Sequence, residues 1–273
     1  MSSDTAPKHL GTRVPGQAVI EELLALQRQV VPRSTLQRIF GVSPLGPESR
    51  PWYRGALGEM TVGRILENLG PDWLVLHAVP VGTGSSDIDH VLIGPGGVFT
   101  INTKNHSGQP IWVAGRTLMV AGTKTRHLYN AAHEAARAAR LLTAAVGFPV
   151  EVTAVVVVVE PKSLTIKGRP EHAAVVTDAQ LLRWLRRFKP ALGGEEMRRI
   201  SAAAILPGTW HKRPAAQGDL LALQRNFGAL RHLENQARRR RAAWVLGVPA
   251  AGFVILANAA GFSGAVLHML GGR

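Results

Sequence analysis

The chain of 273 residues contains no cysteine. It therefore has no disulfide framework and no thiolate ligands for a metal site. Acidic residues are also scarce: 18 Asp and Glu stand against 32 Lys and Arg, which gives a net charge of +14 and a pI of about 11.3. A chain this basic favours a polyanionic partner, either nucleic acid or the anionic face of a membrane.

Several functional signatures are absent as well. Residues 1–16 lack the apolar core of a signal peptide, and we expect them to form a disordered lead. The glycines at 82–84 are not followed by the lysine and helix start of a nucleotide-binding phosphate loop. No histidines stand with acids at the spacing of a zinc site. The last two absences argue against a nucleotide-binding phosphate loop and a zinc site, and the lack of cysteine fits a reducing cytoplasm.

Charge is missing altogether from residues 242–270, which contain no Asp, Glu, Lys or Arg. This stretch exceeds the roughly 20 residues that a helix needs to cross a bilayer. Four arginines at 238–241 precede it, and such a run marks the cytoplasmic end of a span. The sequence thus predicts one transmembrane helix, with the rest of the protein at the cytoplasmic face of the cell membrane. The alternative is a buried C-terminal helix, weakened by Pro249 and several glycines.

The distribution of prolines, charges and apolar residues predicts four regions. These are an N-terminal helical arm and linker over 1–51, a main domain over 52–214, a basic linker helix over 215–241, and the transmembrane segment over 242–270.

Within the main domain, short apolar runs alternate with helical patterns. We expect helices over 53–69, 130–146, 178–188 and 194–204, and strands over 73–79, 87–93, 98–104, 111–114, 117–120, 152–159 and 173–177. The unbroken β-branched run at 152–159 is typical of a strand in the middle of a sheet covered on both faces. The pattern as a whole predicts an α/β fold, a mixed sheet flanked by helices.

Two neighbouring strands carry the residues that suggest chemistry. Side chains two apart on a strand share a face, so Asp87 and Asp89 point the same way, and so do Asn102 and Lys104. A glycine-rich turn at 94–97 would pair the two strands. Oxygen ligands of this kind suit Mg²⁺, and a lysine beside them can position water or stabilise a transition state. Alternatively, Asp87 caps a turn and Asp89 forms an ordinary cross-strand pair with Lys104.

Three segments together resemble a known family. They are residues 55–59 (Gly-Ala-Leu-Gly-Glu), 87–95 (Asp-Ile-Asp-His-Val-Leu-Ile-Gly-Pro) and 97–105 (Gly-Val-Phe-Thr-Ile-Asn-Thr-Lys-Asn). They look like the nuclease-related domain, NERD, of the PD-(D/E)xK restriction-endonuclease-like superfamily, and the likeness extends over roughly 53–182. The resemblance implies a restriction-endonuclease-like mixed sheet, and cleavage of DNA or RNA that depends on Mg²⁺, with Mn²⁺ as an alternative ion.

Carried over residue by residue, the resemblance implies that Asp89 is the first catalytic acid, Lys104 the catalytic lysine and Glu59 the acid of the first helix. Asn102 stands where the family has an acid two residues before the lysine. The implied catalytic set is Asp89, Lys104, Asn102 and Glu59, and the implied metal ligands are Asp89, Asn102 and Glu59 with Asp87 in reserve. From its sequence context alone, Glu59 can equally be a solvated helix acid paired with Arg54.

Three functions are compatible with these patterns. The first is a membrane-anchored, metal-dependent nuclease. The second is a catalytically weakened nucleic-acid-binding module on the same fold, because Asn102 brings an amide oxygen but no negative charge. The third is an interaction or membrane-surface protein in which the arginines at 238–241 only fix the topology.

Overall fold

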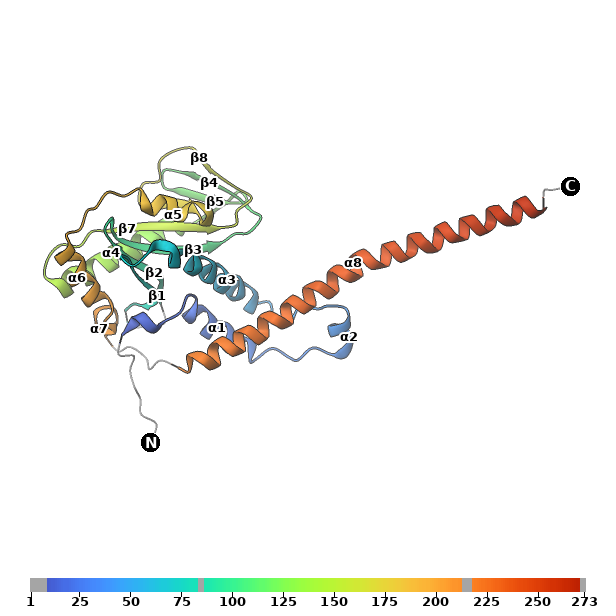
Figure 1. Cartoon of the computed structure of the whole chain (residues 1–273), viewed down its shortest axis with the longest axis horizontal. Coiled ribbons are helices and arrows are strands. Elements are labelled where there is room, and N and C mark those ends of the chain that lie inside the picture. Colours follow the sequence, from blue (N-terminus) through green and yellow to red (C-terminus); the bar gives the residue numbers. More distant parts are fainter. Residues whose placement is uncertain (1–8, 83–85, 213–217, 271–273) are drawn as a thin grey trace, which may run out of the picture. The chain divides into compact units, whose positions relative to one another are not determined.

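The computed structural model describes residues 9–82, 86–212 and 218–270, and for residues 248–270 it describes the backbone alone (Figure 1). The chain divides into two compact units. The first comprises residues 1–25 and 50–220, and the second comprises residues 26–49 and 221–273. The arm predicted over 1–51 is therefore divided between the two units. Its residues 1–8 lie outside the described part of the chain, as do residues 215–217 of the predicted linker helix.

The main sheet of the first unit has five strands in the order β1-β2-β3-β7-β9. They are β1 (Leu74–Pro80), β2 (Asp87–Gly94), β3 (Gly97–Asn105), β7 (Val152–Val159) and β9 (Ala174–Thr177). The first three strands are antiparallel, whereas β3, β7 and β9 run parallel. The β-branched run therefore forms an inner strand, as its composition predicts.

The valines of β7 show why this strand is covered on both faces. Val155, Val157 and Val159 pack with residues of α3 (Ser49–Leu66) and α5 (Asp178–Arg186). Their neighbours Val156 and Val158 pack on the other face with α4 (His127–Val146). This alternation follows from the two-residue period of a strand, and burial of an apolar side chain of this kind stabilises the fold by about 1.5–3 kcal/mol.

A second sheet packs its apolar residues against α4 and β7. Its order is β6-β5-β4-β8, with β6 (Thr123–Thr125), β5 (Thr117–Val120), β4 (Pro110–Ala114) and β8 (Ser163–Ile166). The sequence predicted the β4–β5 hairpin but not the two outer strands. The short helices η2 (Glu67–Leu69), α6 (Gly194–Ala204) and α7 (Pro207–Trp210) complete the unit. The fold is thus mixed α/β, with two mixed sheets and flanking helices.

The N-terminal lead is more ordered than its composition suggests. Residues 9–16, expected to be disordered, instead pack on the domain through η1 (Leu10–Thr12) and precede α1 (Gln17–Gln27). Leu10 is buried, and its N–H donates to the carbonyl of Ile205 at 2.7 Å. Gly16 adopts φ +75° beside the backbone of Ala56, a left-handed conformation that favours glycine. Burial of Leu10 supplies the ordering energy that a polar lead would lack.

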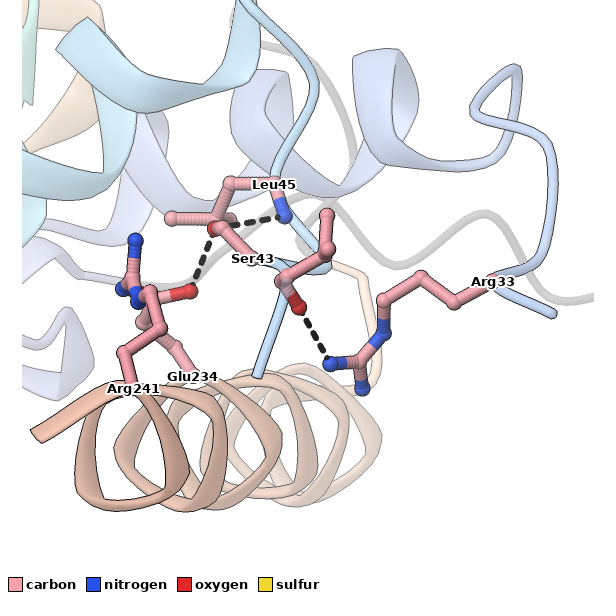
Figure 2. A network of polar contacts seen from close by, with 6 residues as sticks. Arg33, Ser43, Leu45, Glu234 and Arg241 are labelled. Carbon is pink, nitrogen blue, oxygen red and sulfur yellow. Dashed lines mark hydrogen bonds and ion pairs between the residues drawn. The ribbon is translucent and has the colours of Figure 1, made fainter. Parts of the chain in front are cut away.

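In the second unit, the segment 26–49 packs on helix α8 (Leu220–Leu270). Figure 2 shows Ser43 donating to Glu234. The carboxylate of Glu234 also forms an ion pair with Arg241 at 3.2 Å. Arg33 donates to the carbonyl of Val42 at 2.7 Å and holds the segment's own turn. The same segment contains α2 (Thr35–Ile39), which begins with a capping box at Ser34.

The transmembrane segment predicted over 242–270 is not supported. In the part of the chain that the structure describes, no helix is long and apolar enough to cross a membrane. Residues 242–247 do continue α8, but the side chains of residues 248–270 lie outside the description. Residues such as Pro249 and Asn258, together with several glycines, dilute the apolar character of this stretch, which an absence of charge alone does not offset.

Candidate active site

The end of the β2–β3 pair carries the polar residues singled out from the sequence. The two strands pair from the turn at Gly94 and Gly97 to His90 and Ile101. Immediately beyond, the backbone N–H of Thr103 donates to Asp89 Oδ2 at 2.6 Å. The carboxylate of Asp89 is thereby held against β3, between the positions of Asn102 and Lys104. Burial raises the pKa of the Asp89 carboxyl, and the attraction of Lys104 opposes that shift.

Glu59 of α3 joins this group from the helix. It is 4% exposed, so its interpretation as a solvated acid paired with Arg54 is wrong. Burial first, and then repulsion from Asp89 and Asp87, raise the pKa of Glu59 well above its usual value. Lys104 opposes this shift, and so does a hydrogen bond from the backbone N–H of Gly16. The N-terminal segment therefore helps to build the site.

Asp87 completes the row of acids on β2. Burial and the neighbouring charge of Asp89 raise the pKa of Asp87 to about 7, against the opposing attraction of Arg13. Its Oδ2 atom is buried and makes no hydrogen bond with any residue that the structure describes. A buried carboxylate oxygen of this kind is costly to leave unpaired.

The structure adds one residue that the motif pattern missed. Glu134 of α4 accepts hydrogen bonds from the side-chain amide Nδ2 of Asn102, at 2.8 Å to one carboxylate oxygen and 2.9 Å to the other. Burial, with a further contribution from Asp89, raises the pKa of Glu134 to about 7, although the bond from Asn102 lowers it. Glu134 is the only acid in the 20 residues of α4, and it adjoins the buried alanines 131, 135 and 138. That isolation beside an apolar stripe was the available signal.

The strand opposite Asp89 has an unusual backbone. On β1, His77 pairs with His90 and Val79 with Ile88, and Ala78 between them has φ +47°. Positive φ is uncommon for a residue with a side chain and costs about 1–3 kcal/mol, and such residues cluster at functional sites. His90 itself is buried and contacts His77 through their Nδ1 atoms at 2.8 Å. Its contact is with His77 rather than with the acids, and burial keeps its pKa well below the usual value.

A divalent cation is implied by the family resemblance, and the donor chemistry suits one. Three oxygens are buried and have no hydrogen-bond partner among residues 9–82, 86–212 and 218–270, namely Glu59 Oε2, Asp87 Oδ2 and Asn102 Oδ1. Oxygen donors with repelling charges are what a hard cation neutralises. Within the described ranges, however, no three acidic or histidine side chains are grouped closely enough to hold an ion by themselves. A bound ion would therefore need the amide oxygen of Asn102, together with water, in its coordination sphere.

A second polar group lies where α4 begins. His106, just after β3, and His127 face each other through their Nε2 atoms at 3.0 Å. Burial and the nearby charge of Lys104 lower the pKa of both rings. Two residues further on, Tyr129 is 59% exposed, and the guanidinium of Arg126 lies 4.8 Å from its ring centre. His133 lies nearly parallel to Tyr129, at 10°.

Comparison with known proteins shows which part of the chain matches a described family. The family model of the nuclease-related domain matches residues 54–159. An uncharacterised protein of Bacillus anthracis is 42% identical to this chain over 69 residues, which is 24% of this chain and 31% of that relative. The match thus spans about a third of the relative's length. No solved structure matches the chain. Residues 54–159, which contain α3, β2, β3 and α4 with their polar residues, therefore match the nuclease-related domain, NERD.

Proposed function

We propose that this chain is a metal-dependent nuclease that hydrolyses phosphodiester bonds of DNA or RNA. The observation that carries the proposal is the convergence of Glu59, Asp89, Asn102 and Lys104 at one end of the β2–β3 pair. The match of this region to the nuclease-related domain supports it. The net charge of +14 suits a polyanionic substrate.

In this proposal Asp89, Glu59 and the amide oxygen of Asn102 hold Mg²⁺ or Mn²⁺, and Asp87 is a reserve ligand. Such an ion would lower the pKa of a bound water and offset the charge that develops on a phosphate. The Thr103 N–H fixes the orientation of Asp89. Lys104 provides a positive charge beside Asp89, where it can orient the attacking water or donate to a phosphate oxygen.

The direct test is phosphodiester cleavage by the full chain, measured on labelled DNA and RNA in the presence of Mg²⁺ or Mn²⁺ and again with excess chelator. Cleavage should depend on the cation and be lost in Asp89→Ala and in Lys104→Ala. Activity that survives either substitution would contradict the assignment. The matched control is Lys162→Ala, because Lys162 lies outside the site, in the connection between β7 and β8.

A second function is favoured by one specific observation, the amide at position 102. With Asn102 in place of an acid, the chain would bind nucleic acid through its basic surface without cleaving it. This alternative predicts salt-sensitive binding and no cation-dependent cleavage. Appearance of cleavage in Asn102→Glu, with none in the natural chain, would favour it over the first proposal.

Neither proposal depends on where the protein resides. Attachment to the cytoplasmic face of the cell membrane stays a prediction from the sequence around 238–270 alone. Fractionation of the full chain, compared with a variant that ends at residue 241, tests it. Equal recovery of both forms in the supernatant would contradict the predicted anchor.

A further inference from the structure

Asn102 is oriented by a single partner. The side-chain Nδ2 of Asn102 donates to both carboxylate oxygens of Glu134, at 2.8 and 2.9 Å. Asn102 is only 4% exposed. An amide has its donor and acceptor on opposite branches, so fixing the nitrogen toward Glu134 turns Oδ1 away from it. That oxygen is buried and has no hydrogen-bond partner in the described part of the chain. Since a buried acceptor without a partner is costly, its orientation requires an explanation.

Glu134 also belongs electrostatically to the cluster of acids. Its carboxylate is repelled by Asp89 and attracted by Lys104. It comes from α4, 32 residues after Asn102, so neither the strand pattern nor the resemblance assigns it a role. Position 102 and position 134 together thus bring one carboxyl group and one amide to a place beside Lys104.

We propose that Glu134 supplies the negative charge that Asn102 lacks, so that the hydrogen-bonded pair Asn102–Glu134 takes the place of a single acid in a divalent-cation site. Asn102 would direct Oδ1 toward the ion. Glu134, on the other side of the amide, would fix that orientation, and its negative charge would offset part of the ion's positive charge without coordinating it. This inference rests on the proposed function. Partners that orient a ligand in this way typically change metal affinity by about 10–100-fold.

A plain structural role for Glu134 makes a different prediction. A buried amide–carboxylate pair that only satisfies hydrogen bonds would matter for folding and not for metal affinity. The two roles are separated by exchanging the groups: Asn102→Asp combined with Glu134→Gln is isosteric at both positions and restores one acid and one amide. It keeps the net charge and the donor–acceptor pair but moves the negative charge onto β3.

The experiment is a calorimetric titration of Mn²⁺ into the full chain, without nucleic acid. Four forms are compared: the natural chain, Glu134→Gln, the double variant Asn102→Asp/Glu134→Gln, and Asp89→Ala as the control for the proposed site. Glu134→Gln should weaken Mn²⁺ binding about 10–100-fold, and the double variant should return to within about threefold of the natural affinity. Matching thermal unfolding of Glu134→Gln and the natural chain in chelator shows that the fold is intact.

The outcomes separate the two claims. If Asp89→Ala abolishes Mn²⁺ binding while Glu134→Gln binds as the natural chain does, the inference fails and the proposed metal site stands. A double variant that binds Mn²⁺ as weakly as Glu134→Gln also overturns the inference, because a negative charge at position 102 would then fail to replace the one at position 134. If the natural chain binds no Mn²⁺, both the inference and the metal-dependent function are overturned.

Discussion

Asp89 Oδ2 accepts the backbone N–H of Thr103 at 2.6 Å, just where the regular pairing of β2 and β3 ends. The carboxylate thus takes the place of a strand partner, and β3 holds it in one orientation. A hydrogen bond to an ionised acceptor contributes about 1.5–3 kcal/mol. Asp89 therefore has a structural role in addition to its proposed chemical one, and the two can be separated.

The first prediction compares two substitutions of Asp89. Asp89→Asn keeps an oxygen that accepts the Thr103 N–H, whereas Asp89→Ala removes it. We expect Asp89→Ala to lower the free energy of unfolding by about 1.5–3 kcal/mol and Asp89→Asn to cost much less, while both abolish metal-dependent cleavage. Urea unfolding and a cleavage assay measure the two effects. Cleavage by Asp89→Asn at the natural rate would show that the charge is not needed.

The second prediction concerns pH. The pKa of Asp87 rises from 3.8 to about 7 in the folded protein. Between these two pH values, the folded state therefore binds more protons at Asp87 than the unfolded state does. Asp87 should therefore lower stability as the pH rises from about 4 to about 7, in opposition to the buried histidines, whose lowered pKa makes stability rise over the lower part of that range. Asp87→Asn removes this loss and should raise the Tm at pH 8 but not at pH 4, by about 2–4 °C for each kcal/mol recovered.

The exposed acid Asp72, in the turn before β1, provides the matched control. Asp72→Asn should leave the pH dependence of the Tm unchanged. Equal Tm values for Asp87→Asn and the natural chain at pH 8 would mean that Asp87 is not forced to ionise in a desolvated site. Addition of Mn²⁺ should reduce the loss of stability that Asp87 causes, since a cation relieves the repulsion among the acids.

A third prediction addresses nucleic-acid contact at the beginning of α4. Tyr129 is an exposed ring with Arg126 against it, beside the His106–His127 pair. Stacking of a base on such a ring contributes about 1–3 kcal/mol. Tyr129→Ala should weaken binding of a single-stranded oligonucleotide about 5–100-fold, measured by anisotropy in chelator, whereas Tyr129→Phe should keep most of the affinity.

Leu206 serves as the control for exposed apolar area, because it is 50% exposed and lies just before α7. Leu206→Ala should bind the oligonucleotide as the natural chain does. Equal binding by Tyr129→Ala and the natural chain would remove Tyr129 from the interface without affecting the proposal for the acids.

A fourth prediction tests the second unit. Gly41 has φ +70°, and a Cβ atom there would lie 2.5 Å from the carbonyl oxygen of Ala237 and 2.6 Å from the nitrogen of Arg241 on α8. Gly41→Ala should therefore release the segment 26–49 from the helix and expose it to limited proteolysis. Gly122 is the control. Its φ of +83° is equally unfavourable for alanine, but a Cβ atom there would meet none of the described residues within 4 Å. If both alanine variants are digested alike, the close contact with α8 is not what holds the segment.

Sequence patterns located the elements well where the determinants are local. The turn at 94–97 and the alternation along β2 and β3 indicate which side chains share a face, because both depend only on neighbouring residues. The outer strands β6 and β8 were not predicted. Each has four or fewer residues, and such a short strand without a buried face shows little periodicity. The predicted span over 242–270 was inferred from an absence of charge, and the described helices do not support it.

By itself, the sequence determined the α/β fold, the strand pair that bears Asp89 and Lys104, and the gap in charge at Asn102. Only the tertiary structure brought Gly16 to Glu59 and Glu134 to Asn102. The reason is physical: strand alternation is a property of adjacent residues, whereas the pairing of an amide on β3 with a carboxylate on α4 depends on how buried apolar faces bring a distant helix against the sheet. Burial then makes the charges of these acids depend on one another, which no local pattern records.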